Sequence, residues 1–202
     1  MYKKLFAVCA LLFTVSFSAN AALITIESAD ANFGNNTNVD LAGYWAGLDA
    51  DDISSEAFTA ATMLFSGSQF NNSIYKMTIN LFPGTERQFS FFAGLDAGNG
   101  AELFHNGALI ADINSNLWWS KRWSNNSVIA QNMQLGAGSN QLTFFWAENS
   151  NSGGNSFEFA IDGAERAALS VNNVQAQVPT PGTLGLFALT LIGLSLFGRR
   201  KG

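Results

Sequence analysis

The sequence has 202 residues, a formal net charge of −5 and one cysteine, Cys9. An acidic chain of this kind is unsuited to nucleic acid, because phosphate backbones are recognised mainly through lysine and arginine. A single cysteine excludes an internal disulfide and a thiolate metal cluster. No zinc, phosphate-loop or serine-nucleophile motif occurs, so the motifs favour a protein that is not an enzyme.

Residues 1–21 have the layout of a secretory signal peptide. Two lysines precede an apolar stretch over residues 5–17, and Ala19 and Ala21 place small residues at the −3 and −1 positions of a cleavage site. The stretch is too short to span a membrane stably, and it lacks the polar face of a buried amphipathic helix. We therefore expect export through the Sec translocon and cleavage by signal peptidase after Ala21.

Residues 22–163 show the pattern of an all-β domain that lies outside the cytoplasm. Apolar and polar residues alternate in several short segments that are separated by glycine and asparagine turns, and Asn106-Gly107 is a strong hairpin signal. These segments predict an antiparallel β-sandwich. Residues 28–56 read mostly as loop, and residues 164–177 as a last short strand and a stalk. The strands are expected over residues 23–27, 74–82, 88–95, 102–105, 108–113, 127–135, 140–147 and 157–161.

The C-terminal residues 178–202 combine three features in a fixed order. Two prolines separated by one residue favour an extended backbone, which a processing enzyme could grip. The uncharged segment 182–198 is near the lower length limit of a membrane-spanning helix. A basic end follows, which predicts that the C-terminus lies on the cytoplasmic side. The expected processing motif is Val178, Pro179, Thr180, Pro181 and Gly182, and the basic end is Arg199, Arg200 and Lys201.

This tail resembles the PEP-CTERM sorting signal in its Pro-Thr-Pro-Gly variant, with Thr180 where the commonest form has glutamate. The resemblance implies that an exosortase processes the tail during export. It also implies anchoring in the inner membrane, followed by transfer to the cell surface or the extracellular matrix. The alternative is an ordinary single-pass anchor that is never cut.

Residues 74–163 resemble a PA14 domain, most clearly from residue 88 onward. That part contains a strand that ends at an Asp-containing corner, the hairpin sequence LFHNGALIAD, a tryptophan-rich connection, a Gly-Ala-Gly turn and an aromatic strand. It is also similar to a PEP-CTERM group named for a Cys-Cys-x-Gly motif, although loop 148–154 contains no cysteine. The resemblance implies the β-sandwich found in bacterial toxins, glycosidases and fungal adhesins.

Two loops could supply oxygen ligands to calcium, because hard cations take several oxygens from flexible loops. Sugar-binding PA14 adhesins hold calcium with two consecutive aspartates at a corner that here reads Asp96-Ala97. The resemblance therefore supplies one aspartate of that pair. The alternative for each loop is a solvated acidic turn. The candidate ligands are Asp96, Asn99 and Glu102 in one loop and Asp49, Asp51 and Asp52 in the other.

Indole rings stack on sugar faces, and asparagine side chains bind hydroxyl groups, so a tryptophan cluster is a candidate glycan site. Its members are Trp118, Trp119, Trp123 and Asn125. The alternative is that the indoles cover an edge of the sandwich, since tryptophan has a large area to bury. Adjacent residues of an extended chain face opposite ways, so we expect at least one of Trp118 and Trp119 in the core.

Two functions remain open from the sequence. One is a non-catalytic structural or adhesive role in an exopolysaccharide or biofilm matrix. The other is a glycan-binding, lectin-like module assisted by calcium, the only cofactor considered. A hydrolase is disfavoured, because the single histidine, His105, directly precedes the predicted hairpin turn and no catalytic constellation is assembled.

Overall fold

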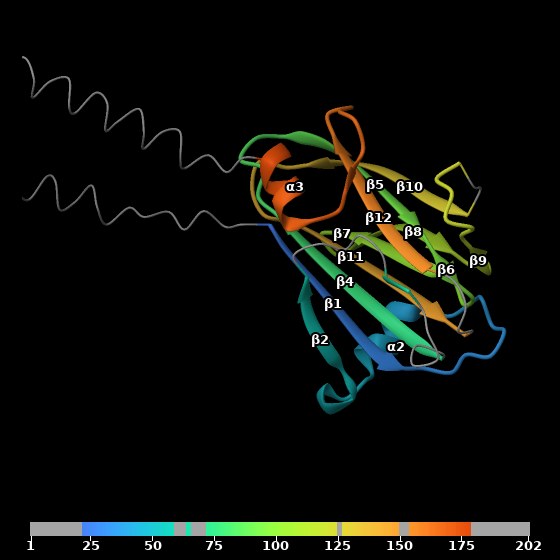
Figure 1. The fold of residues 1–202 in the computed structure, drawn as a ribbon. Coiled ribbons are helices and arrows are strands. Elements are labelled where there is room, and N and C mark those ends of the chain that lie inside the picture. Colours follow the sequence, from blue (N-terminus) through green and yellow to red (C-terminus); the bar gives the residue numbers. More distant parts are fainter. Residues whose placement is uncertain (1–21, 59–63, 66–71, 125–126, 150–153, 179–202) are drawn as a thin grey trace, which may run out of the picture. The chain divides into compact units, whose positions relative to one another are not determined.

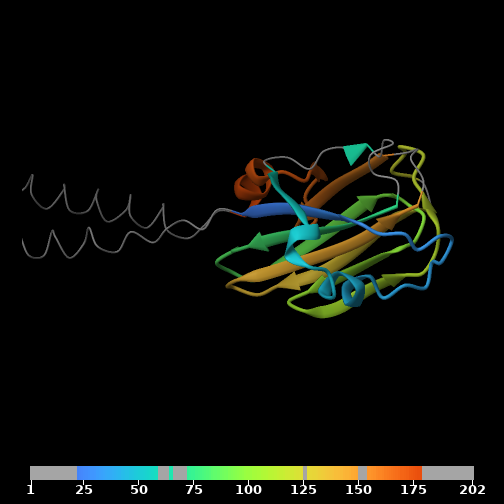
Figure 2. The ribbon, with the colours of Figure 1, turned by 90° about the horizontal axis from the view of Figure 1, so that it is seen from below.

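A computed structural model of the chain describes residues 22–58, 64–65, 72–124, 127–149 and 154–178, all within one compact unit. The predicted signal peptide, the predicted membrane helix and the basic end lie outside these residues. None of the helices that the structure describes is long and apolar enough to cross a membrane. The unit consists mainly of two facing antiparallel sheets (Figures 1 and 2), which confirms the prediction of a mostly β, antiparallel fold.

The larger sheet has six strands in the order β2-β1-β4-β11-β7-β8. Asp30 pairs with Ser73, and Ser73 pairs with Glu148, so the last residue of β1, the first of β4 and the last of β11 lie at the same end of the sheet. The strands are β1 (Leu23–Asp30), β2 (Ser54–Phe58), β4 (Ser73–Leu81), β7 (Ala101–His105), β8 (Ala108–Ile113) and β11 (Asn140–Glu148).

The smaller sheet has the strand order β10-β5-β12-β13, and β3 pairs with the first residues of β12. A separate two-stranded pair, β6 with β9, follows the end of β5. The bounds are β3 (Leu64–Phe65), β5 (Arg87–Gly94), β6 (Asp96–Ala97), β9 (Leu117–Trp118), β10 (Val128–Leu135), β12 (Gly154–Ile161) and β13 (Ala167–Ala168).

The core between the sheets is aromatic. Phe91 of the smaller sheet and Phe144 of the larger one are fully buried, and their rings meet edge to face at 5.5 Å. Trp146 lies 5.4 Å from Phe157 across the same interface. Such rings bury large apolar areas, which is the main favourable contribution to folding. The alternating apolar positions predicted from the sequence therefore form the core.

The predicted hairpin at Asn106-Gly107 is confirmed. Both residues have positive φ angles, of 50° and 80°, as a two-residue turn of type I′ requires. The Asn106 side chain also accepts a hydrogen bond of 2.8 Å from the backbone N–H of Gln141, which ties the turn to β11.

The region predicted as loop contains a short helix, α2 (Leu41–Ala46), as well as the 3-10 helix η1 (Ala50–Asp52) and strand β2. Asp40 caps α2 by accepting a hydrogen bond of 2.7 Å from the Gly43 N–H. Leu41 and Trp45 are buried in a cluster on the outer face of the larger sheet. The six-residue helix offers too few apolar positions for its period to be recognised in the sequence.

Residues 164–177 contain the predicted last short strand, but the remainder folds as a helix where a stalk was expected. Strand β13 pairs with β12, and helix α3 (Val171–Gln177) then packs onto the sandwich. Val174 and Val178, one helical turn apart, are buried in the main core. Arg87 donates a hydrogen bond of 3.2 Å to the carbonyl of Gln177. The folded domain therefore extends to Val178, the first residue of the predicted processing motif.

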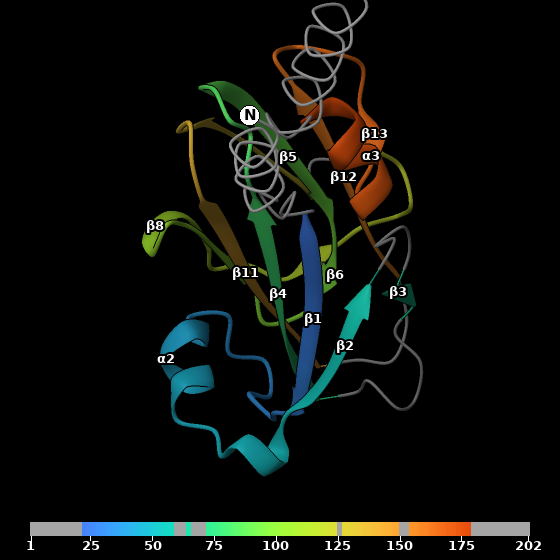
Figure 3. The same cartoon turned by 90° about the vertical axis from the view of Figure 1, so that its left-hand side faces the viewer.

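The chain enters and leaves this domain at the same end. Leu23 at the start of β1 pairs with Asn80 near the end of β4, and Arg87 at the start of β5 contacts the end of α3. Helix α2 lies toward the other end of the sandwich from α3 (Figure 3). Strands β6 and β9 lie at that other end too (Figure 1), which leaves it remote from Ala22 and Val178.

Candidate functional site

The end of the sandwich remote from Ala22 and Val178 gathers a cluster of buried polar side chains, which we call the acid–amide cluster. It consists of Asp96, Asn99 and Glu148, whose exposed fractions are 5%, 1% and 1%. Asp96 lies in β6, just after β5, and Glu148 is the last residue of β11. The Asn99 N–H donates a 3.1 Å hydrogen bond to the carbonyl of Ala147, which holds the two segments together.

The orientation of Asn99 is set by its hydrogen bonds. Its Nδ2 donates to the carbonyls of Gly34 and Asn36, at 2.9 and 2.8 Å, and thereby holds the loop before α2 against the cluster. Because these partners are both acceptors, the amide oxygen must point elsewhere. Oδ1 is buried and has no hydrogen-bond partner.

Asp96 is in a similar position. Its backbone N–H donates to Oδ1 of Asn155 at 2.9 Å, whereas its carboxylate oxygen Oδ2 is buried without a partner. Burial and, to a smaller extent, the nearby carboxylate of Glu148 raise the pKa of Asp96 to about 7. Two carboxylates that lie near each other out of water are stable when they share a proton or a bound cation.

Glu102, a predicted calcium ligand, has a different role in the structure. Its Oε1 accepts from the N–H of Leu41 and its Oε2 from that of Ala42, both at 2.9 Å. These donors are among the backbone groups that the start of a helix leaves unpaired, so Glu102 anchors α2 to β7. Burial raises the pKa of Glu102, while the two hydrogen bonds act in the opposite direction.

Glu148 was not identified from the sequence. It ends a long aromatic strand, and its proximity to Asp96 depends on the pairing of segments about fifty residues apart. The second predicted calcium loop forms no cluster of this kind, because Asp49, Asp51 and Asp52 lie exposed in and next to η1. Within the described part of the chain, no three His, Cys, Asp or Glu side chains gather closely enough to hold a metal ion by themselves.

The two adjacent tryptophans face opposite ways, as expected. Trp118 is 65% exposed and lies in register with Asp96, whereas Trp119 is only 3% exposed. The Trp119 indole N–H donates to the carbonyl of Arg122 at 3.1 Å, and the ring of Trp123 lies 5.1 Å away. Most of the Trp118 ring is therefore exposed to solvent, whereas Trp119 is structural. Asn125, the fourth predicted glycan residue, lies outside the described residues.

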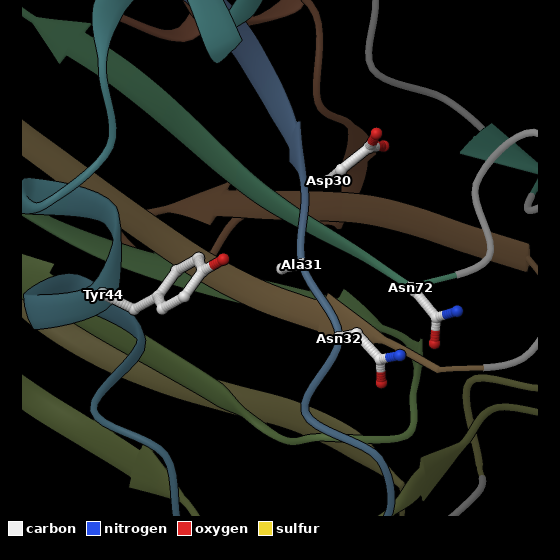
Figure 4. A pocket seen from close by; sticks show the side chains of 5 residues that line it. All are labelled: Asp30, Ala31, Asn32, Tyr44 and Asn72. Carbon is white, nitrogen blue, oxygen red and sulfur yellow. The ribbon is translucent and has the colours of Figure 1, made fainter.

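A shallow hollow of about 370 Å³ lies at the same end of the sandwich (Figure 4). Asp30, Ala31, Asn32, Tyr44 and Asn72 line it. The Tyr44 ring is 38% exposed and is supported by the edge of Phe33 at 4.8 Å. In Figure 4 the amides of Asn32 and Asn72 point to the same side, and the Tyr44 hydroxyl points toward β1. An aromatic ring beside several amides can bind a polyhydroxylated molecule.

His105 does not take part in this site. It ends β7 at the Asn106-Gly107 hairpin, and its Nε2 lies 3.4 Å from Oδ1 of Asn140 at the start of β11. Glu148 ends the same strand, so the histidine and the acid–amide cluster lie at opposite ends of β11. The described residues therefore do not bring a histidine to the buried carboxylates.

No protein-family model and no curated protein matches this sequence. Solved structures do match. A PA14 sugar-binding domain from an RTX adhesin is 18% identical, covers 75% of this chain and 96% of its own, and has a TM-score of 0.56. The Epithelial Adhesin 9 A domain from Candida glabrata is 9% identical over 73% of this chain and 87% of its own, with a TM-score of 0.43.

The β-glucosidase from Kluyveromyces marxianus is 10% identical over 76% of this chain, with a TM-score of 0.43. The match covers only 17% of that enzyme. The match to the RTX adhesin domain, with a TM-score of 0.56, shows that the chain has a mostly β, PA14-like fold. The PEP-CTERM resemblance of the tail remains a prediction.

Proposed function

We propose that this protein is an exported, non-catalytic adhesive domain that binds glycans at the acid–amide end of its sandwich. The observation that carries the proposal is the combination of buried, unpartnered oxygens on Asp96 and Asn99 with an exposed indole, Trp118, in register with Asp96. Stacking on an indole and hydrogen bonding to oxygens and amides are complementary to a sugar. The fold supports the proposal, since the RTX adhesin domain is described as sugar-binding.

Calcium fits the acid–amide cluster. Asp96 and Asn99 offer Oδ2 and Oδ1, two hard oxygen ligands that are otherwise unsatisfied, and Glu148 adds a second carboxylate. These three residues would hold the ion, in place of the predicted set with Glu102. Bound calcium supplies positive charge and open coordination positions that sugar hydroxyl groups can occupy. The protein's own part is to keep the oxygens in place, through Asn155 and the loop held by Asn99.

Binding is tested on residues 22–178, which form one compact unit. We expect calcium to raise the melting temperature and to permit binding on a glycan array, and EDTA to abolish both effects. Asp96→Asn should remove them, whereas Asp51→Asn, an exposed control, should not. If no glycan binds with or without calcium, the glycan-binding proposal fails, and a purely structural role in an exopolysaccharide or biofilm matrix is favoured.

Export and sorting belong to the same proposal. The signal-like residues 1–21 and the tail 178–202 support delivery through the Sec translocon and processing by an exosortase. Val178 is buried and ends the folded domain, so a cut near Thr180 would leave the domain intact. Mass spectrometry of the protein from its native envelope should find a C-terminus near Thr180. An intact Gly202 would contradict processing.

A further inference from the structure

We propose that the bound glycan is an extended, uncharged polysaccharide. It continues from the acid–amide cluster onto the outer face of the smaller sheet, along β5. This inference rests on the proposed function and specifies its ligand. The proposed surface, called the β5 track, consists of Trp123, Phe92, Arg166, Ser90, Asn132 and Gln134.

Strand register places the β5 track on the solvent side of the sheet. Phe89, Phe91 and Ala93 point into the core, so Ser90 and Phe92 point outward. Asn132 pairs with Ser90 on the neighbouring strand β10. From Gly94 to Gln88 the strand extends over about 20 Å, at roughly 3.3 Å per residue. The face is therefore long enough for several sugar units in a row.

At the Gly94 end of β5, the track carries the indole of Trp123, which packs on the ring of Trp119. Trp119 packs against Gly94, on the outer side of β5, where a Cβ atom would lie 2.4 Å from its ring. Trp123 lies on Trp119, and Lys121 takes a positive φ of 61° in the turn between them. Lysine rarely adopts this conformation, so the turn that brings Trp123 onto Trp119 carries local strain. Trp118, the last residue of β9, instead pairs with Asp96 of the acid–amide cluster.

In the middle of the track, the ring of Phe92 is covered by the side chain of Arg166. The guanidinium of Arg166 lies 3.7 Å from the centre of the Phe92 ring. Glu158 pairs with Phe92 in the sheet. Burial raises the pKa of Glu158, and the positive charge of Arg166 has a smaller effect that lowers it. The opposite charges of Glu158 and Arg166 therefore offset each other at this point of the face. The guanidinium also has N–H groups that can donate to sugar hydroxyls.

Toward the start of β5, the track is formed by the amides of Asn132 and Gln134 on the neighbouring strand β10. The Ser90 hydroxyl donates to Oδ1 of Asn132 at 2.6 Å, which leaves the Asn132 NH₂ group directed elsewhere. Asn132 and Gln134 are exposed, and no charged residue lies on the outward positions of β10. In a chain of net charge −5, this face is suited to an uncharged chain of hydroxyl groups.

The test is the dependence of affinity on chain length. Glucan, galactan and mannan oligosaccharides of one, three and six units are titrated into residues 22–178 with calcium. We expect at least a tenfold gain in affinity from one unit to six. Asn132→Ala combined with Gln134→Ala, and separately Trp123→Ala, should reduce this gain to less than threefold while monosaccharide affinity is unchanged. Gln141→Ala, an exposed amide on the other sheet, should have no effect.

The outcomes separate the two proposals. Equal affinity for one and six units overturns the β5 track but leaves the proposed function intact. Failure to bind any of the sugars overturns both. A gain that survives the double amide variant also overturns the track, since the proposal assigns the gain to those two side chains. Light scattering is recorded in parallel, because a dimer lost in the same variants would show that a second copy occupies the face.

Discussion

The indole of Trp119 occupies the space in which a side chain on Gly94 would lie, 2.4 Å from the position of its Cβ atom. Gly94→Ala should therefore force the ring or the strand to move, at a cost of about 1–3 kcal/mol in the free energy of unfolding. Urea denaturation followed by tryptophan fluorescence measures this. Gly136→Ala is the matched control, because no atom lies within 4 Å of its added Cβ. Equal stability of the two variants would contradict the packing.

The neighbouring tryptophans should respond differently to truncation. Trp119→Ala removes a buried ring and should lower the free energy of unfolding by about 3–5 kcal/mol. Trp118→Ala removes a ring that is 65% exposed and should change it by less than about 0.5 kcal/mol. On the proposed function, Trp118→Ala should nevertheless weaken glycan binding. A large loss of stability from Trp118→Ala, with binding unchanged, would reverse the roles assigned here.

Glu102→Gln tests the attachment of α2. A carboxylate accepts both helix N–H groups, whereas an amide can accept only one and presents its own N–H to the other. The free energy of unfolding should fall by about 1–3 kcal/mol, and the amides of Leu41 and Ala42 should exchange hydrogen faster. Hydrogen exchange with mass spectrometry measures the local effect. The exposed Glu86→Gln serves as control, and unchanged exchange at both amides would disprove the anchoring role.

Asp96 should make the stability depend on pH when calcium is absent. Burial raises its pKa from 3.8 to about 7, so between these values the native state holds a proton that the unfolded chain has released. The resulting stability is complete below the unfolded pKa and is lost as the pH rises through about 7. The melting temperature in EDTA should fall over this interval, and Asp96→Asn should flatten the fall. Calcium should restore stability at the upper end.

An unaltered pH profile in Asp96→Asn would show that another group titrates. Asp51→Asn provides the comparison, because the Asp51 side chain is exposed. Its profile should match that of the unmodified domain.

Most of the sheet structure could be predicted because its signal is local. Met77, Ile79 and Leu81 alternate with polar residues, and this pattern alone indicates one buried face. Asn106-Gly107 likewise specifies its own turn. The helix α3 could not be recognised in the same way, since Val171, Val174 and Val178 lie in a short, mostly polar segment that gains its stability by packing on the sandwich.

The acid–amide cluster could be predicted only in part. Asp96 and Asn99 stand out as polar residues in a glycine-rich loop after a strand. Glu102 binds the backbone of α2, whereas Glu148 lies in the cluster with Asp96. These positions follow from strand register and from the position of α2. Register across distant strands is not determined by the local pattern, so the sequence pointed to Asp96 and Asn99, two members of the cluster, but not to Glu148.

The chain enters at Ala22 and leaves at Val178, at the end remote from Trp118 and the acid–amide cluster. A mechanical load between a bound surface and the chain ends therefore acts along the strands. Hydrogen bonds in an antiparallel ladder are perpendicular to the strands, so such a load shears many of them together instead of opening them in sequence. β1, which carries the N-terminal end, is paired with β4 along all eight of its residues. On the proposed adhesive function, a load between the glycan and the chain ends would therefore meet the direction in which this sheet resists separation best.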